Sequence, residues 1–86
     1  MLHTFNKPQA YIDNQPYVAP DDQILFIEDG VYALLGDEAL NSRSEVYALE
    51  IDVKARGLSD KIHCKVISHQ DFVTLCVETG QIKNWF

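Results

Sequence analysis

Two cysteines are the residues of this 86-residue chain best suited to covalent chemistry, and Cys64 is the stronger candidate. It lies in "KIHCKVI", where Lys61, His63 and Lys65 surround it. Nearby cations lower the pKa of a thiol and make its thiolate available. Cys64 is therefore the candidate for sulfur chemistry, and the elements around it decide whether the thiol can react.

The alternative is that both cysteines pack in the core. Cys64 shares strand parity with Ile62, which favours an inward-pointing position. Its neighbour His63 would then point to the opposite face, so it does not supply the base that a nucleophile needs. Cys76 follows Phe72 by four residues on an apolar helical stripe, where a free cysteine behaves as a small hydrophobe. We predict that Cys76 is structural, whereas a role for Cys64 stays open.

No metal, cofactor or acid–base site is predicted. The spacings of His3, His63 and His69 relative to Cys64 match no compact zinc pattern, and a CxxC pair is absent. The carboxylates of "EDG" follow a predicted strand and could exchange protons, but helix capping by Asp29 is the simpler interpretation. The chain has no glycine-rich phosphate loop and no Ser-His-Asp arrangement. The residues alone therefore define no catalytic site.

Four segments have the length and composition of strands. "ILFIE" is a continuous apolar run, which is typical of a strand buried on both faces. Alternation of such segments with short helices predicts an α/β fold of three layers, in which a mainly parallel sheet has about four strands. The predicted strands are "LHTF" near the start, Ile24–Glu28, Glu45–Glu50 and Lys65–Ser68.

Capping residues and glycines predict where the helices begin and end. Asp29 is expected to cap a helix through "GVYALL" that stops at Gly36. Asp52 is expected to cap "VKAR" before Gly57. The last helix is expected over Gln70–Thr79, because Ser68 and Asp71 approximate a capping box before it and Gly80 follows it.

Two segments are predicted to lack regular structure. Asn6–Gln23 holds all three prolines and is expected to be mostly loop, with at best one short helical turn. "DEALNSRS" is polar and is expected to form a turn. Residues 1–86 are expected to make one domain, and a chain of this size commonly needs a partner to complete its buried surface.

Charge and hydropathy limit the kinds of partner. Thirteen acidic and seven basic residues give a net charge of −6, which disfavours direct binding to nucleic acid. No apolar run reaches the roughly 20 residues of a membrane span, and no signal peptide is recognisable. We expect a cytoplasmic protein with reduced thiols. Four scattered cations are interpreted as a solvated face: Lys54, Arg56, Lys61 and Lys65.

Several blocks together resemble the TusB/DsrH family of sulfur-relay proteins. The combination is fairly specific, because the blocks occur in the order found in the family, whereas any one alone would be weak. They leave out about Phe5–Ile27 and Leu35–Glu45. The blocks are "MLHT" (Met1–Thr4), "DGVYAL" (Asp29–Leu34), "VYALEIDVKARGL" (Val46–Leu58) and "VISHQDFVTLCVETGQIKNWF" (Val66–Phe86).

The resemblance implies a DsrE-like fold and a function through assembly. It implies a heterohexamer containing two copies each of this chain, a TusC-like and a TusD-like subunit. Such a complex accepts persulfide sulfur and passes it to a further carrier, and the end product is the 2-thio group on the wobble uridine of certain transfer RNAs. The expected role is that of a non-catalytic subunit, without direct contact to nucleic acid or membrane.

The family's working cysteine has no counterpart in this chain. That cysteine lies on the TusD-like subunit, and some DsrH-type members carry another in the first helix. This chain has none before Asp29. Two alternatives stay open: Cys64 itself carries a persulfide, or the chain serves a DsrH-type complex in dissimilatory sulfur oxidation.

Four apolar residues are predicted to contribute to the interface with the partner subunits. Aromatic residues are enriched in interface cores, and a terminal "WF" has little reason to be exposed to water. The alternative is that these residues complete the small core of the chain itself. They are Tyr32, Leu34, Trp85 and Phe86.

Overall fold

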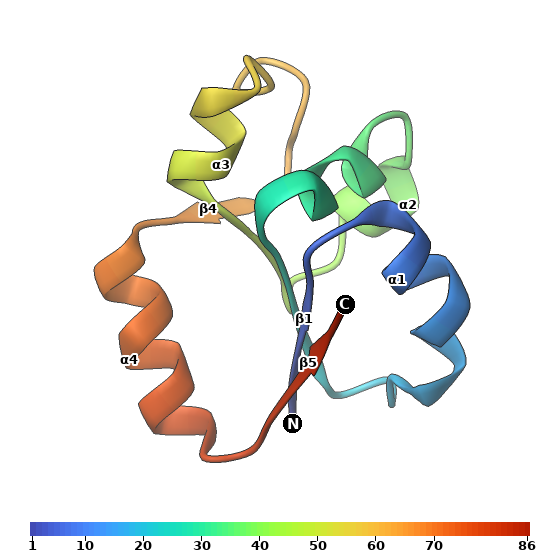
Figure 1. The fold of residues 1–86 in the computed structure, drawn as a ribbon, viewed down its shortest axis with the longest axis vertical. Coiled ribbons are helices and arrows are strands. Elements are labelled where there is room, and N and C mark those ends of the chain that lie inside the picture. Colours follow the sequence, from blue (N-terminus) through green and yellow to red (C-terminus); the bar gives the residue numbers. More distant parts are fainter.

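A five-stranded sheet divides the molecule, with helical segments on both of its faces (Figure 1). The computed structural model describes all residues from Met1 to Phe86. Every neighbouring pair of strands is parallel, and the strand order is β4-β3-β2-β1-β5. The strands are β1 (Leu2–Phe5), β2 (Gln23–Phe26), β3 (Val46–Leu49), β4 (Lys65–Ile67) and β5 (Ile82–Trp85).

The direction of each crossover decides which face its helix covers. The first three connections step along the sheet in one direction, so right-handed crossovers place their helices on one face. The last connection returns from β4 to the far edge, and α4 therefore lies alone on the other side of the sheet (Figure 1). The helices are α1 (Pro8–Asn14), α2 (Glu38–Asn41), α3 (Glu50–Ala55) and α4 (His69–Thr79), with 3-10 segments η1 (Gln15–Tyr17) and η2 (Glu28–Leu34).

The main core lies on the face covered by α1, η2, α2 and α3. Strand residues alternate between the faces, so Phe5, Phe26 and Ala48 point into this core. The ring of Phe5 meets those of Tyr11 and Phe26 at centroid distances of 5.3 and 5.9 Å. Burial of these aromatic and aliphatic side chains supplies most of the driving force for folding.

The face beneath α4 is less well covered. Leu2, Leu25 and Ile67 are buried there, but no residue of α4 itself is buried. Val73 and Val77 of α4 remain 49% and 77% exposed. All-parallel sheets normally have both faces covered, so this face is the less complete side of the fold.

The N-terminal segment departs from the loop predicted for it. α1 spans seven residues and η1 three, so Asn6–Gln23 is largely helical. Pro8 and Pro16 each lie in the first turn of their helical segment, where the missing N–H would have had no partner. The prolines therefore begin the two segments, and the loop prediction was wrong.

Two of the predicted helix caps are also wrong. Ile27 and Leu49 occupy the N-cap positions of η2 and α3, whereas Asp29 and Asp52 lie inside those helices. Both carboxylates instead contact Arg56, at 2.9 and 3.3 Å. The prediction assumed that the helices begin after Asp29 and Asp52, whereas η2 begins at Glu28 and α3 at Glu50.

The segment predicted as a polar turn contains α2. The Asp37 carboxylate accepts the backbone N–H of Leu40 at 2.9 Å and so caps this helix. The predicted cap of α4 is confirmed, because Ser68 Oγ accepts the N–H of Asp71 at 3.1 Å. Gly80 ends α4 in the left-handed conformation, with φ of 76°, as predicted.

The C-terminal tail forms a strand that was not predicted. β5 pairs in parallel with β1, and Leu2 N donates to Gln81 O at 2.9 Å where the pairing begins. The sheet therefore has five strands where about four were expected. None of the helices combines the length and the apolar character that crossing a bilayer requires.

Candidate functional site

Cys64 is buried in the main core. Its side chain is 8% exposed, and burial raises the pKa of the thiol to about 11. At neutral pH, roughly one molecule in ten thousand would then carry the thiolate. His63 points away, with Nδ1 3.7 Å from a carboxylate oxygen of Glu38. The inward position predicted from strand parity is confirmed, and the local cations do not activate the thiol.

The two cysteines lie on opposite faces of the sheet. Cys64 belongs to the main core, whereas Cys76 on α4 packs against the small cluster beneath that helix. Both thiols are free, and burial raises the pKa of Cys76 as well. They cannot act as a dithiol pair because the sheet separates them.

Two of the four predicted cations, Lys54 and Arg56, form ion pairs near the surface. Arg56 contacts Asp29 and Asp52, and the hydrogen bond to Asp29 raises the pKa of its guanidinium. Lys54 lies 3.7 Å from Glu50 one helical turn away. No group of three or more His, Cys, Asp or Glu side chains lies close enough to hold a metal ion.

The predicted interface residues have different surroundings. Leu34 is fully buried in the main core of this chain, so it is not available to a partner. Tyr32 on η2 is 41% exposed, and Phe86 is 76% exposed. The structure therefore leaves Tyr32 and Phe86 at the surface and Trp85 half-buried, while Leu34 completes the core.

The C-terminal aromatics belong to a larger surface cluster. The ring of Trp85 stacks on Tyr17 with a centroid distance of 5.7 Å, and Lys83 Nζ lies 4.9 Å from the Trp85 ring. Tyr17 is 69% exposed. We call Tyr17, Lys83, Trp85 and the adjoining Phe86 the tail patch. Sequence reasoning found only its last two residues, because Tyr17 is distant in sequence.

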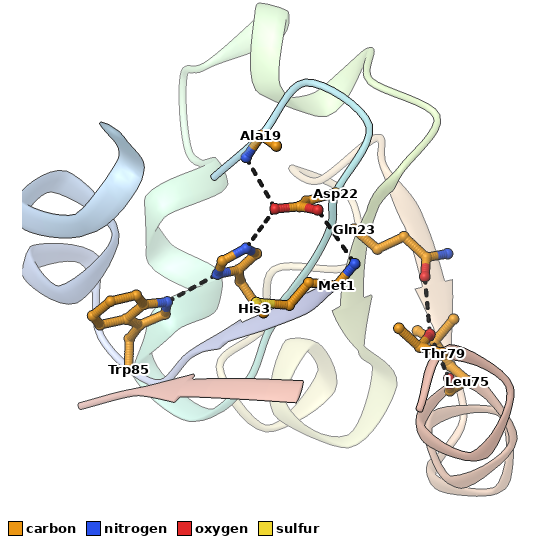
Figure 2. Close-up of polar contacts among 8 residues, drawn as sticks. All are labelled: Met1, His3, Ala19, Asp22, Gln23, Leu75, Thr79 and Trp85. Carbon is orange, nitrogen blue, oxygen red and sulfur yellow. Dashed lines mark hydrogen bonds and ion pairs between the residues drawn. The ribbon is translucent and has the colours of Figure 1, made fainter. Parts of the chain in front are cut away.

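A buried polar network beneath the tail patch was missed by the sequence analysis (Figure 2). His3 is 2% exposed, and Trp85 Nε1 donates to His3 Nδ1 at 3.0 Å. His3 Nε2 lies 2.8 Å from Asp22 Oδ2. The signal in the sequence was the parity of His3 with Phe5, which points a polar ring into the core and requires hydrogen-bond partners.

Asp22 gathers several donors at one carboxylate. Besides His3, the backbone N–H of Ala19 donates at 3.0 Å and the Met1 amino group at 3.2 Å. The hydrogen bond from His3, followed by that from Ala19, lowers the pKa of the Asp22 carboxyl to about 2. The ionised form of Asp22 is therefore the one that fits the folded protein.

The network predicts a loss of stability in acid. Because the pKa of Asp22 falls from 3.8 to about 2 on folding, its contribution is present above about pH 4 and disappears as the pH falls towards 2. Asp22→Asn should lower the free energy of unfolding by about 1 to 2 kcal/mol at pH 7 and much less near pH 2. Urea unfolding at several pH values measures this. Asp21→Asn, which changes the net charge by the same amount, is the control. If the free energy of unfolding depends on pH in the same way for both variants, the prediction is contradicted.

A second surface feature lies where α4 crosses the sheet. A pocket of about 220 Å³ opens between α4 and the strands β3 and β4. Thr79 Oγ1 lies 2.7 Å from the carbonyl oxygen of Leu75 and 3.1 Å from Gln23 Oε1, so its single proton is shared between α4 itself and β2 (Figure 2). The pocket has charges of both signs on an apolar floor, and it is lined by Tyr47, Lys65, Ile67, Asp71, Thr74, Leu75 and Glu78.

Fold and site together define a small α/β protein with a parallel sheet, a buried thiol and an exposed aromatic edge. Protein Tm0979 from Thermotoga maritima, solved by NMR, has the same fold. Its TM-score is 0.67 at 21% identity, and the match covers 94% of this chain and 97% of that one. This likeness concerns the fold alone.

Sequence relatives extend the comparison to a family. The family model described as "DsrH like protein" matches residues 12–82. Protein TusB of Photorhabdus laumondii is 39% identical over 75 residues, which is 79% of each chain. Protein TusB of Cronobacter sakazakii is 35% identical over 95 aligned positions, covering 99% of this chain and 100% of that one. The chain belongs to the TusB/DsrH family of sulfur-relay proteins.

Proposed function

We propose that this chain is a non-catalytic subunit of a sulfur-relay complex that supports 2-thiolation of the tRNA wobble uridine. It acts in the cytoplasm by assembling with TusC-like and TusD-like subunits, two copies of each, and through that complex it serves a downstream sulfur carrier. Family membership supports the sulfur relay. The buried thiol of Cys64 supports the non-catalytic role, because a persulfide carrier needs an accessible sulfur.

The observation that carries the assembly role is the open edge at β5. β5 pairs only with β1, and it ends the sheet. The carbonyl oxygen of Gln81 accepts a hydrogen bond from Leu2 of β1. In a parallel ladder the backbone N–H and C=O groups of Lys83, two residues further on, therefore also face β1. Ile82 and Asn84 then direct their backbone N–H and C=O groups to the open edge. An unpaired edge of this kind is a template on which another chain can pair.

The tail patch supplies apolar contact beside this edge. Phe86 and Tyr17 are largely exposed, and Trp85 is half-buried between Tyr17 and the core. Exposed aromatic residues are the side chains that most often carry binding energy at interfaces. The proposal therefore assigns Trp85 and Phe86 to the partner interface, together with the exposed Tyr32 on η2.

Truncation after Lys83 is expected to abolish the complex. The change removes Asn84, Trp85 and Phe86, and with them the end of β5. Phe86→Ser is the milder variant, and it should weaken assembly roughly tenfold or more because an exposed side chain contributes to binding rather than to the fold. Native mass spectrometry of the chain co-expressed with its TusC-like and TusD-like partners measures both effects.

The matched control is Ile51→Ser on α3, another apolar residue that is 69% exposed. It should leave assembly unchanged, which separates the tail from exposed apolar residues in general. A truncated chain that still assembles with equal copies of all three subunits would reject the role of the tail. If the untruncated chain forms no complex with either the TusC-like or the TusD-like subunit, the proposed function itself is rejected.

Cys64→Ser is expected to leave sulfur transfer by the assembled complex unchanged. The thiol is buried and its pKa is raised to about 11, so it does not supply a thiolate. Cys64→Ala serves as the apolar control for packing. Transfer of persulfide sulfur through the reconstituted complex is the measurement, and loss of transfer in both variants with assembly intact would make Cys64 a sulfur carrier.

A further inference from the structure

The hydrogen bonds of His3 fix the protonation state of its ring. The indole N–H of Trp85 is a donor only, so His3 Nδ1 must accept and therefore carries no proton. The remaining ring hydrogen is on Nε2 and points to Asp22 Oδ2. His3 is thus neutral in this arrangement, and it connects the C-terminal strand to the loop before β2 (Figure 2).

Protonation would affect the two bonds of His3 differently. An imidazolium has N–H groups at both nitrogens, so Nδ1–H would face the indole N–H and that bond would be lost. The Nε2–H bond to Asp22 would persist, because the Asp22 carboxyl has a pKa of about 2 and stays ionised where imidazoles titrate. One proton therefore removes the connection to Trp85 and keeps the connection to Asp22.

The other ionisable groups near His3 do not replace the lost acceptor. Lys83 is the register partner of His3 on β5, and its Nζ lies over the Trp85 ring. From η1, Tyr17 stacks on the outer side of Trp85. From α1, Tyr11 packs against Phe5, further along β1. The Met1 amino group bonds to Asp22, on the side of the network away from the indole.

β5 is held by its parallel backbone pairing with β1 and by few side-chain contacts. It is an edge strand, and its first three residues are exposed. One further side-chain bond ties it to β1, from Thr4 Oγ1 to Asn84 Oδ1 at 2.6 Å. Trp85 is the residue of β5 that packs against the main core. The bond between Trp85 and His3 is therefore the polar contact that fixes the core-facing side chain of this strand.

We propose that His3 is a proton-operated latch on the C-terminal strand: neutral His3 holds Trp85 and β5 against the sheet, and protonation at Nδ1 releases them. The released segment carries Lys83, Trp85 and Phe86, three of the four residues of the tail patch. A consequence for partner binding rests on the proposed function, whereas the latch itself is a property of the isolated chain.

NMR of the full-length ¹⁵N-labelled chain between pH 7.5 and 5 tests the latch. The chain has one tryptophan, so the indole N–H signal belongs to Trp85 alone. The ring ¹⁵N shifts of His3 should show the Nε2–H tautomer at pH 7.5. As Nδ1 gains its proton, the indole signal should shift, and amide protection factors in β5 should fall roughly tenfold relative to those in β2.

His3→Asn is the matched variant, because the amide oxygen of Asn is bonded to Cγ, as Nδ1 is in histidine, and can accept the indole N–H without titrating. In this variant β5 protection should not change relative to β2 over the same range. The exposed His63 and His69 remain in both proteins, so their ring signals provide internal references for the spectra. If the variant does not fold, the wild-type measurement still decides the question.

Three results would overturn the latch. One is a proton on His3 Nδ1 at pH 7.5, and another is protonation of Nδ1 while β5 stays as protected as β2. The third is a His3 ring that keeps its Nε2–H tautomer down to pH 5. The consequence for assembly is tested separately, by native mass spectrometry of the complex over the same pH range. Release of β5 without a loss of the complex would reject the role of the tail patch in binding and leave the latch intact.

Discussion

Replacing Gly30 by alanine is expected to destabilise the fold by about 3 kcal/mol. A Cβ atom at Gly30 would lie 2.0 Å from the carbonyl oxygen of Phe5 and 2.8 Å from its carbonyl carbon. Both are backbone atoms of a strand inside the sheet, so neither can rotate away. Either η2 or β1 has to shift, and both line the main core. The glycine of "DGVYA" is thus required for the close approach of η2 to β1.

The control for this prediction is Gly36→Ala. Gly36 has nothing within 4 Å of an added Cβ, but its φ of 74° lies in the left-handed region. Alanine there should cost only about 1 kcal/mol, from backbone strain alone. Urea unfolding of both variants gives the comparison. A loss for Gly30→Ala no larger than that for Gly36→Ala would mean that the chain relaxes around the added methyl group.

The helices and strands that were predicted well from the sequence are those with a strong local sequence pattern. The first four strands lie within a residue or two of their predicted positions, because apolar runs in parallel sheets are nearly continuous. α4 begins at its predicted cap and ends at Gly80. Pro8 and Pro16 were misread because a proline interrupts a helix interior but suits its first turn. The presence of a proline alone does not show whether it lies in the first turn of a helix or in a loop.

The polar network depends on pairings that no local pattern contains. Trp85 and His3 are 82 residues apart, and they meet because β5 returns to pair with β1. The tail was not predicted as a strand, so its partner could not be named. Tyr17 joined the tail patch for the same reason. Candidate residues at the C-terminus were found by their type, whereas their supporting contacts required the fold.

The two faces of the sheet suggest how stability and function are divided. The main core contains most of the largest fully buried side chains. The open edge at β5 and the face beneath α4 have exposed apolar groups and few buried residues. Variants in the main core should therefore affect unfolding, and variants at the edge should affect assembly with less effect on the fold.

Asn41 is the residue that joins α2 to the segment preceding β4. Its Nδ2 donates to the carbonyl oxygens of Leu34 and Asp37 at 2.7 and 2.8 Å. Its Oδ1 accepts the backbone N–H groups of His63 and Cys64 at 2.8 and 3.2 Å. Two carbonyls on one side and two N–H groups on the other fix the orientation of the amide. At 6% exposure, water has little access to replace these bonds.

Asn41→Ala is expected to lower the free energy of unfolding by about 3 kcal/mol, because it leaves the backbone N–H groups of His63 and Cys64 without an acceptor. It also removes one of the two donors to each of the carbonyl oxygens of Leu34 and Asp37. Asn41→Asp keeps the shape and the acceptor but places a carboxylate against two carbonyl oxygens, so it should also destabilise the fold. That loss should shrink as the pH falls, because a protonated carboxyl can donate to one carbonyl oxygen. Asn14→Ala, which removes a single bond to Ala10 O, should cost only about 1 kcal/mol. Urea unfolding at pH 7 and pH 4 measures the free energy of unfolding of all three variants. If Asn41→Ala lowers it no more than Asn14→Ala does, the segment before β4 is held by its apolar contacts alone.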